Sequence, residues 1–275
     1  MMCLQRPAKH SRPAWTAALL CAALGLVSGA PAPAAEPAVA WGAKKGIGLS
    51  ESRGLGDRQL AALKVGWYYN WGAKTGVTTQ VRFVPMIFSG RTVDSDVRGT
   101  AVLGFNEPDH EKQSAMSVEQ ALALWPKVAA KGGLVVSPAV AGNPVDGDWL
   151  PAFMQAQPRV DCIAVHWYKG PNVKKFIRDI EEVHARYHTP VLVTEFAPQT
   201  TSSSRDNPAK YSQAEVEEFI AGTTAWMEAA PFVAGYAWHD AKAGTSALFD
   251  DKGGLTATGR AYAAAGQRRR PAAAK

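Results

Sequence analysis

The sequence predicts an α/β protein, folded as a compact (β/α)8 TIM barrel in a single domain. Short apolar runs alternate with stretches of helical period along the chain, and eight of the runs have the length of a β-strand. Their apolar character is nearly continuous, as in parallel strands that are buried on both faces. Eight strand–helix units within about 230 residues suit the compact end of this fold's size range.

The eight predicted strands follow one another with turn or cap residues between them. They span residues 46–50, 65–71, 81–88, 101–107, 134–140, 162–168, 191–196 and 233–239. An open, doubly wound sheet is the alternative arrangement for such a pattern. That fold gathers its ligand contacts at one switch point, whereas this chain carries acids at the ends of two distant strands. The barrel is therefore the favoured prediction.

The helices between these strands are marked by apolar faces and by N-terminal caps. The helix that ends before Pro190 carries apolar residues at spacings of three and four from Val173 to Tyr187. The links after the first three strands are short, and only residues 57–64 are predicted to be helical there. Capping side chains precede three later helices: Asn172, Ser212 with Glu215, and Ser117 with Gln120.

The two ends of the chain differ in composition from the part between them. Three basic residues, an apolar run over 15–27 and the segment Ala32-Pro33-Ala34 predict a secretory signal peptide over residues 1–35. The apolar run is too short for a membrane-spanning helix. We therefore expect a secreted protein, extracellular or periplasmic, with the barrel domain over residues 36–267 and a basic disordered tail over residues 268–275.

Most of the positive charge lies at these two ends. Of the formal net charge of +6, the leader supplies three charges and the tail, with three arginines and one lysine, supplies four. The part between them is therefore near −1 (6 − 3 − 4). Such a body offers no basic surface for a nucleic acid. We expect no nucleic-acid partner, no membrane association after processing, and a monomer.

Residue patterns of several other enzyme classes are missing. The leader holds two of the three cysteines, and the apolar neighbours of Cys162 predict a buried side chain rather than a nucleophile. The sequence has no Gly-x-Ser-x-Gly elbow, phosphate-binding glycine loop or dinucleotide fingerprint. His166, His239 and Asp240 could bind a metal, but no helix carries the His-Glu-x-x-His spacing. No metal and no cofactor are predicted.

Two glutamates stand at the ends of predicted strands. Glu107 closes the fourth strand and Glu195 the seventh, 88 positions later (195 − 107). Because the active site of such a barrel forms where its strands end, both acids would face one cavity. Two carboxyl groups about 5 Å apart can cleave a glycosidic bond with retention, one as the nucleophile and one as the acid. Two unrelated surface glutamates are the alternative interpretation.

Aromatic residues at other strand ends favour a sugar-binding cleft. Tyr69 and Trp71 fall on one face of the second strand, His166 and Tyr168 on one face of the sixth, and Trp238 near the end of the eighth. Sugar rings have apolar faces and many hydroxyls, so their sites need aromatic walls and a few polar groups. Each aromatic alone could equally be a core residue, but together they mark one end of the barrel.

The motifs at these strand ends resemble those of glycoside hydrolase family 128, small (β/α)8 enzymes of a retaining clan with acids on strands four and seven. The resemblance spans residues 44–264. It is carried by Gly66-Trp67-Tyr68-Tyr69-Asn70-Trp71, Phe83-Val84-Pro85-Met86, Leu103-Gly104-Phe105-Asn106-Glu107-Pro108-Asp109, Ser137-Pro138-Ala139, Val165-His166-Trp167-Tyr168, Thr194-Glu195-Phe196, Tyr236-Ala237-Trp238 and Gly254-Leu255-Thr256-Ala257-Thr258-Gly259-Arg260-Ala261-Tyr262.

This resemblance implies hydrolysis of β-1,3-glucan of the laminarin or curdlan type, by internal cleavage and without a cofactor. Glu107 would be the acid/base and Glu195 the nucleophile, while Asn106 would hydrogen-bond the 2-hydroxyl of the sugar. His239 and Asp240 stand where many similar proteins have Phe and Gly, which leaves the shape of the eighth-strand loop open.

The resemblance also implies roles for the aromatic residues. Tyr168 and His166 would orient the nucleophile or a neighbouring hydroxyl, and Trp238 would floor the central subsite. Tyr69 and Trp71 would line the cleft further along. Two alternatives stay open: a non-catalytic β-1,3-glucan-binding protein on the same scaffold, and the same mechanism acting on another β-linked polysaccharide.

Overall fold

The strands of the protein are short and parallel. The computed structural model describes residues 41–97, 99–198, 210–241 and 244–266. The predicted signal peptide over 1–35, the end of the domain at residue 267 and the tail over 268–275 lie outside these residues and stay predictions. The strands are β1 Lys45–Gly48, β2 Trp67–Tyr69, β3 Arg82–Phe83, β4 Gly99–Leu103, β5 Gly132–Val136, β6 Ile163–Trp167, β7 Val191–Phe196 and β8 Val233–His239.

Pairing between the strands closes a ring. Six strands form one parallel sheet in the order β3-β2-β1-β8-β7-β6, and β4 pairs with β5. Parallel bridges from Met86 to Leu103 and from Val136 to Cys162 join the two sheets. Each strand therefore neighbours the next one in sequence, and β8 neighbours β1. This confirms the barrel and excludes the open sheet.

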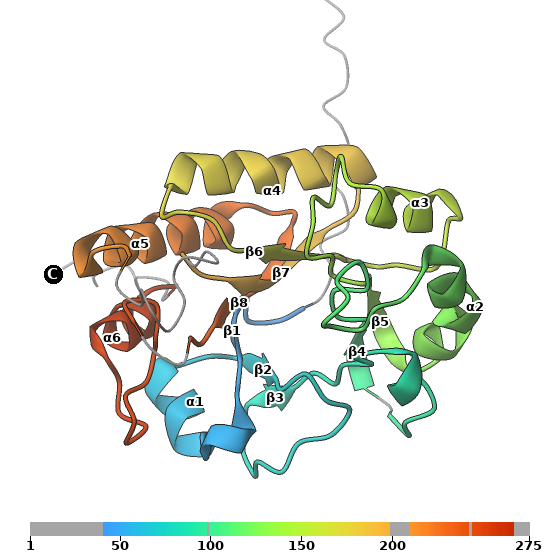
Figure 1. Cartoon of the computed structure of the whole chain (residues 1–275). Helices are drawn as coiled ribbons and strands as arrows, with labels where there is room; N and C mark the ends of the chain where they lie inside the picture. The colour runs from blue at the N-terminus through green and yellow to red at the C-terminus, as the bar shows by residue number, and fades with distance from the viewer. Residues whose placement is uncertain (1–40, 98, 199–209, 242–243, 267–275) are drawn as a thin grey trace, which may run out of the picture. The chain divides into compact units, whose positions relative to one another are not determined.

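Helices surround the strands (Figure 1). Each predicted cap is present: Asn172 accepts from the Lys175 N–H, and Ser117 and Ser212 form capping boxes with the residues three positions on. No helix of the described part is both long and apolar enough to cross a bilayer. The α-helices are α1 Asp57–Leu63, α2 Val118–Ala129, α3 Trp149–Gln155, α4 Val173–Tyr187, α5 Gln213–Ala229 and α6 Ala257–Ala264, and the short 3-10 helices are η1 Glu51–Arg53 and η2 Gly90–Thr92.

Alternation along the strands divides the core into two layers. Trp67, Leu103 and Cys162 belong to a cluster inside the barrel. Their strand neighbours pack outward against the helices in a second, larger cluster. Cys162 is fully buried, which confirms it as a core residue, and burial raises the pKa of its thiol to about 12.

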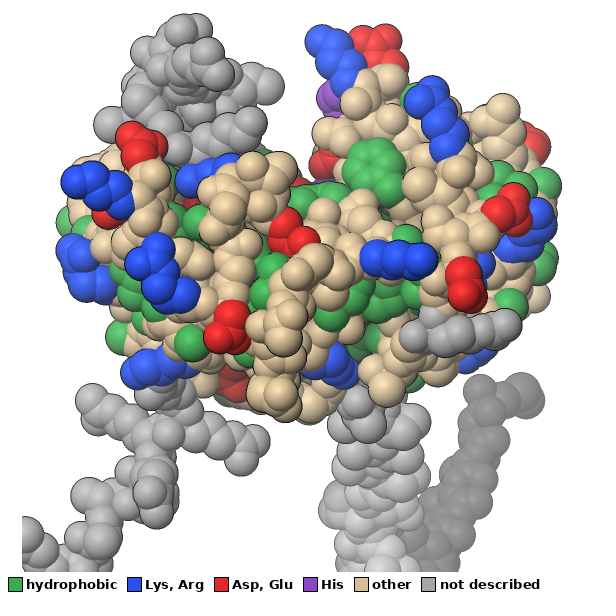
Figure 2. All heavy atoms as spheres, turned by 90° about the horizontal axis from the view of Figure 1, so that it is seen from below, with side chains coloured by type: hydrophobic (Ala, Val, Ile, Leu, Met, Phe, Trp, Pro, Cys, Tyr) green, Lys and Arg blue, Asp and Glu red, His purple; other side chains and the backbone are tan. Residues whose placement is uncertain are grey.

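On the face seen in Figure 2, the described acidic and basic side chains are interspersed with hydrophobic ones.

Six of the eight predicted strands end earlier than expected, among them the third and the fourth. Residues 81–88 contain only the two-residue strand β3, and β4 stops at Leu103, four residues before Glu107. At Gly104 the backbone of β4 approaches β5 so closely that a Cβ would lie 2.8 Å from the Val136 carbonyl oxygen. The chain leaves the regular ladder there, and only a bridge from Asn106 to Ala139 continues the pairing. The prediction that Glu107 is the last residue of a strand was therefore wrong.

Two consecutive lysines at the start of β1 fasten two of the outer helices. The ammonium group of Lys44 donates to three carbonyl oxygens at the C-terminal end of α5, at 2.7–3.2 Å. Lys45 donates to those of Tyr262, Ala263 and Ala265 at the end of α6, at 2.7–3.3 Å. A cation there satisfies carbonyls that have no partner within the helix. Burial lowers the pKa of Lys45 to about 8, although Glu228 opposes this effect.

Replacement of Lys45 should destabilise the barrel by loosening α6. In Lys45→Met, buried carbonyl oxygens lose their donor, and we expect the free energy of unfolding to fall by about 1–3 kcal/mol. Urea denaturation followed by tryptophan fluorescence measures this change. Lys174→Met, which alters an exposed lysine of α4, is the matched control and should change stability little. Equal stability of the two variants would contradict the anchoring role.

Candidate active site

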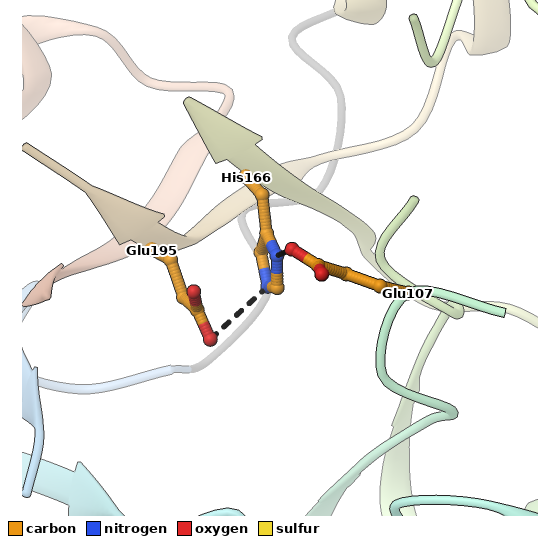
Figure 3. A group of neighbouring side chains, drawn as sticks. All are labelled: Glu107, His166 and Glu195. Carbon is orange, nitrogen blue, oxygen red and sulfur yellow. Dashed lines mark hydrogen bonds and ion pairs between the residues drawn. The ribbon is translucent and has the colours of Figure 1, made fainter. Parts of the chain in front are cut away.

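Glu107 and Glu195 lie close together at the end of the barrel where the strands finish. One carboxylate oxygen of each glutamate and one ring nitrogen of His166 all lie within 4.8 Å of one another. Figure 3 shows the His166 ring between the two acids. Its Nδ1 lies 2.8 Å from Glu107 Oε1 and its Nε2 lies 3.5 Å from Glu195 Oε1. The structure thus brings together the two acids that the sequence singled out.

A β-bulge directs Glu195 into the barrel. Leu192 belongs to the inner layer and Val193 to the outer one, so strict alternation would turn Glu195 outward. In the pairing with β6, however, Val165 lies opposite Val193 while His166 lies opposite Glu195, so Thr194 is skipped. The extra residue restores the inward direction at position 195. The inward and outward alternation of side chains therefore shifts by one residue at Thr194, and this shift turns Glu195 toward the barrel interior.

The backbone at Glu107 has an unusual conformation. Its φ angle is +43°, in the left-handed region that non-glycine residues seldom occupy. Its N–H donates to the Ala139 carbonyl at 2.7 Å, and Pro108 follows it directly. Such strain is retained where the surrounding structure imposes it, and it is concentrated at functional sites.

Asn106 precedes this residue and is also buried, with 3% of its surface exposed. Its amide nitrogen lies 3.4 Å from Gln113 Oε1. Its side-chain oxygen is buried and has no hydrogen-bond partner among the described residues. A buried acceptor of this kind costs free energy unless something else donates to it. It is therefore a candidate contact for a ligand hydroxyl.

Three side chains donate hydrogen bonds to Glu195. Tyr69 and Trp71 donate to Oε1, with donor–acceptor distances of 3.0 and 2.7 Å, and the Tyr168 hydroxyl donates to Oε2. In addition, His239 Nδ1 lies 3.4 Å from Oε2. These residues come from β2, β6 and β8 or from the positions just after those strands. Tyr69 and Trp71 were expected to line the cleft further along; the structure places both against the nucleophile candidate.

The electrostatics of the site favour a charged Glu195. Burial alone would raise its pKa, but His166, His239 and the Tyr168 hydroxyl outweigh burial, and the pKa lies well below its usual range. For His166, burial lowers the pKa, but Glu195 and Glu107 outweigh this and raise it. Burial and the neighbouring carboxylates raise the pKa values of Tyr69 and Tyr168, so both stay protonated donors.

The same three residues, Glu107, His166 and Glu195, could in principle hold a metal ion. The surroundings of Glu195 argue against this use. Both of its oxygens already accept N–H or O–H donors, and these hydrogens point at the lone pairs that a cation would need. Asp240, which the sequence suggested as another ligand, instead pairs with Arg53. Hydrogen-bond donors therefore surround the Glu195 carboxylate, an arrangement that suits a reactive carboxylate better than a metal ligand.

Comparisons with known proteins agree with this geometry. The family described as "Glycosyl hydrolase catalytic core" matches residues 46–262. A GH128 subgroup I endo-β-1,3-glucanase from Amycolatopsis mediterranei, crystallised with laminarihexaose, is 33% identical, with a TM-score of 0.71 over 82% of this chain and 100% of that chain. The chain belongs to glycoside hydrolase family 128. A search of curated proteins finds no match.

Other GH128 structures differ in what they do. A subgroup V exo-β-1,3-glucanase from Cryptococcus neoformans is 26% identical, with a TM-score of 0.68 over 82% of this chain and 100% of that one. A subgroup VII oligosaccharide-binding protein from Trichoderma gamsii is 22% identical, with a TM-score of 0.68 over 81% and 93% of the two chains, a likeness of fold alone. Membership of GH128 therefore does not by itself decide between cleavage modes.

One expected site residue of this GH128 chain lies elsewhere. Trp238 is fully buried in the outer core layer, its ring packs on Phe196 and Tyr262, and its indole N–H donates to the Ser246 carbonyl. No face of the ring is open to a sugar, so the expectation that Trp238 floors a subsite is not supported by its position. The next residue, His239, faces the site instead, because neighbours on a strand point to opposite sides.

The sequence patterns did not predict the contact of His239 with Glu195. His239 was considered there only as a metal ligand or as a change in the eighth-strand loop. Its ring makes edge contacts with Trp71 at 5.7 Å and with Tyr168 at 5.3 Å, measured between ring centroids. Strand alternation would have predicted this contact, but only if it had been known which residues of β8 face the barrel interior.

The charges of His166 and Glu195 contribute most to stability in mildly acidic solution. The pKa of Glu195 is lowered from 4.5, so its contribution is present above pH 4.5 and is lost as the pH falls through the lower folded-state value. The pKa of His166 is raised from 6.5, so its contribution is complete below pH 6.5 and is lost as the pH rises through the raised value.

We therefore expect the stability advantage of the wild type over His166→Gln to be largest between pH 4.5 and 6.5 and to shrink on either side. Urea denaturation of both proteins across this range and about two pH units beyond it measures the difference. A difference that does not change with pH would show that His166 carries no charge in this pair.

Proposed function

We propose that this GH128 protein is a retaining endo-β-1,3-glucanase, with Glu195 as the nucleophile and Glu107 as the acid/base. The observation that carries the proposal is the approach of the two carboxylates to within 4.8 Å. Retaining glycosidases hold their carboxyl groups about 5–5.5 Å apart, whereas inverting enzymes leave about 6.5–9.5 Å for a water molecule. The short separation supports direct attack by one acid.

The two acids differ in the way that their roles require. The side chain of Glu195 is 5% exposed, accepts three hydrogen bonds and is held ionised, which suits an attacking carboxylate. The side chain of Glu107 is 12% exposed and touches only one partner among these site residues, His166. It is therefore free to deliver a proton to the leaving oxygen and to take one from water in the second step.

In the first step, Glu195 attacks the anomeric carbon while Glu107 protonates the departing oxygen, and a covalent glycosyl ester forms. In the second step, Glu107 takes a proton from water, whose oxygen displaces Glu195 with overall retention. The donors on Glu195 also stabilise it as the leaving group in this second step. The free oxygen of Asn106 suits a hydrogen bond from the 2-hydroxyl of the sugar.

The similarity to known β-1,3-glucanases supports β-1,3-glucan as the substrate of this chain. The Amycolatopsis enzyme is described as an endo-β-1,3-glucanase in complex with laminarihexaose, and it is more similar to this chain than the exo-acting Cryptococcus enzyme is. Export directed by residues 1–35 is part of the proposal, because a polysaccharide substrate lies outside the cell.

The assignment of the two acids predicts different behaviour of their variants. Glu195→Gln should release no reducing sugar from laminarin, while Glu107→Gln should lose about 10²–10⁴-fold in turnover. Both variants should keep the wild-type circular dichroism spectrum, and Glu107→Gln should also keep the melting temperature within a few degrees. Wild-type turnover by Glu195→Gln would contradict its role as nucleophile.

Azide rescue separates the two roles by stereochemistry. The test substrate is 2,4-dinitrophenyl β-laminaribioside, whose dinitrophenolate leaves without protonation by an acid. With this substrate and azide, Glu107→Ala should produce the β-glycosyl azide, because azide attacks the covalent glycosyl enzyme. In Glu195→Ala, azide replaces the nucleophile and should give the α-glycosyl azide. Nuclear magnetic resonance of the anomeric proton distinguishes the products. The reverse outcome would exchange the two roles.

Substrate and cleavage mode are tested by product profiles. We expect laminaripentaose to be cut to a mixture of shorter oligosaccharides, and β-1,4-glucan to be left intact. Release of one product size from an end would instead indicate exo action. Binding of laminaripentaose without any product would favour a binding protein like the one from Trichoderma gamsii.

A further inference from the structure

The short helix η1 (Glu51–Arg53) lies between two segments that hold the nucleophile candidate. It carries two opposite charges, Glu51 and Arg53. Glu51 is bonded to the loop after β2, and Arg53 forms an ion pair with the residue after β8. The two segments carry Trp71 and His239, whose rings meet beside Glu195.

Glu51 organises the loop around position 71. Its Oε1 accepts from the Asn70 amide at 2.7 Å and from the Thr75 hydroxyl at 2.6 Å, and its Oε2 accepts from the Gly76 N–H at 2.9 Å. The Asn70 side-chain oxygen in turn accepts from the Gly72 N–H at 2.9 Å. One carboxylate thus fixes residues on both sides of position 71. Partial burial would raise the pKa of Glu51, but these hydrogen bonds together outweigh it and lower the pKa.

Trp71 itself sits in a strained conformation. Its φ angle is +60°, which is costly for a side chain of this size. In this conformation its indole N–H donates to Glu195 Oε1 at 2.7 Å. Gly48 of β1 makes room for it, since a Cβ there would lie 2.9 Å from the indole ring. The strain persists because the bonds from Glu51 hold the residues on either side.

Arg53 acts on the opposite segment in a similar way. Its guanidinium pairs with Asp240, whose side chain is 1% exposed, and the other Asp240 oxygen accepts from the Leu248 N–H at 2.9 Å. Asp240 directly follows His239, whose Nδ1 lies 3.4 Å from Glu195 Oε2. The ion pair therefore fixes the backbone that carries this second contact.

We propose that Glu51 and Arg53 are positioning residues for the nucleophile: through the loops after β2 and β8 they fix Trp71 and His239 on the two oxygens of Glu195. This inference rests on the proposed function of Glu195. Neither residue contacts the carboxylate, so their effect passes through Trp71 and His239. Disturbing either should lower kcat while KM changes little, because the misplaced group is the attacking one rather than a sugar contact.

A double-mutant cycle tests the path from Glu51 to Trp71. Glu51→Gln keeps the size of the side chain but turns an amide NH2 toward a donor, which breaks part of the network. We expect about a tenfold loss of kcat on laminarihexaose in the wild-type background, and less than about twofold in the Trp71→Phe background. The matched control Asp94→Asn, which removes an acid with 79% exposure, should change neither value. Equal losses in both backgrounds would overturn the path through Trp71.

The path from Arg53 to His239 is tested in the same way. Because Arg53→Gln would leave Asp240 buried without a partner, it is combined with Asp240→Asn. The combined variant should lower kcat in the wild-type background and have little further effect in the His239→Phe background. An undiminished loss there would overturn this half of the proposal.

A readout without catalysis separates this inference from the proposed function. In ¹⁵N-labelled protein, the indole N–H of Trp71, assigned from its loss in Trp71→Phe, should exchange with solvent at least about tenfold faster in Glu51→Gln than in the wild type or Asp94→Asn. Unchanged exchange would overturn the positioning role. If the wild type hydrolyses no laminarihexaose, the proposed function fails, while faster exchange in Glu51→Gln would still support the positioning of Trp71.

Discussion

The buried negative charge of Glu195 is the constraint on which the site depends. A carboxylate taken out of water is costly unless its oxygens are paired with donors. Tyr69, Trp71 and Tyr168 supply three hydrogen bonds, and His166 and His239 add ring nitrogens within 3.5 Å. These residues come from β2, β6 and β8 or from the positions just after them. The three strands are far apart in sequence and do not pair with one another, and the closed barrel brings their C-terminal ends around one site.

The three donors to Glu195 are aromatic side chains, so the same residues pack in the barrel core and bind the reactive carboxylate. A tyrosine or tryptophan can pack its ring in the barrel interior while its single polar atom reaches the carboxylate. Tyr69 is fully buried and stacks on Trp67 within the inner core layer. Its single hydroxyl hydrogen is shared between Glu195 Oε1 and the Thr194 carbonyl, both 3.0 Å from the hydroxyl oxygen. Tyr69 therefore contacts both the acid and the bulge that directs the acid inward. The hydrophobic core and the reactive group therefore stabilise each other.

The scaffold around this site is common to proteins with different activities. Endo-acting, exo-acting and oligosaccharide-binding proteins share this fold with the chain, so the barrel itself does not choose among them. The feature that supports the proposed hydrolase activity of this chain is the pair of acids with unequal surroundings: Glu195 is surrounded by donors and ionised, and Glu107 is more exposed. Cleavage mode and chain-length preference depend on the loops at the strand ends, since these shape the space along the sugar chain.

Much of the fold follows from the sequence itself. Continuous apolar runs, caps such as Asn172 and the order of the elements predict a parallel barrel, because these signals are local and have fixed periods. The same reasoning places Glu107 and Glu195 at one end, since parallel strands in a barrel finish on the same side. Short strand boundaries were less predictable: Gly104 ends β4 early because of its close approach to β5, a contact that no local pattern reveals.

The sequence by itself thus determined the barrel, the two acids and the aromatic character of their surroundings. Only the tertiary structure decided which side chains face the cavity. The bulge at Thr194 turns Glu195 inward, alternation from that face exposes His239 to the site and buries Trp238, and the strained backbone brings Trp71 onto the carboxylate. The physical reason is that a shift of one residue in a strand exchanges its two faces, and such shifts arise from pairing between distant strands.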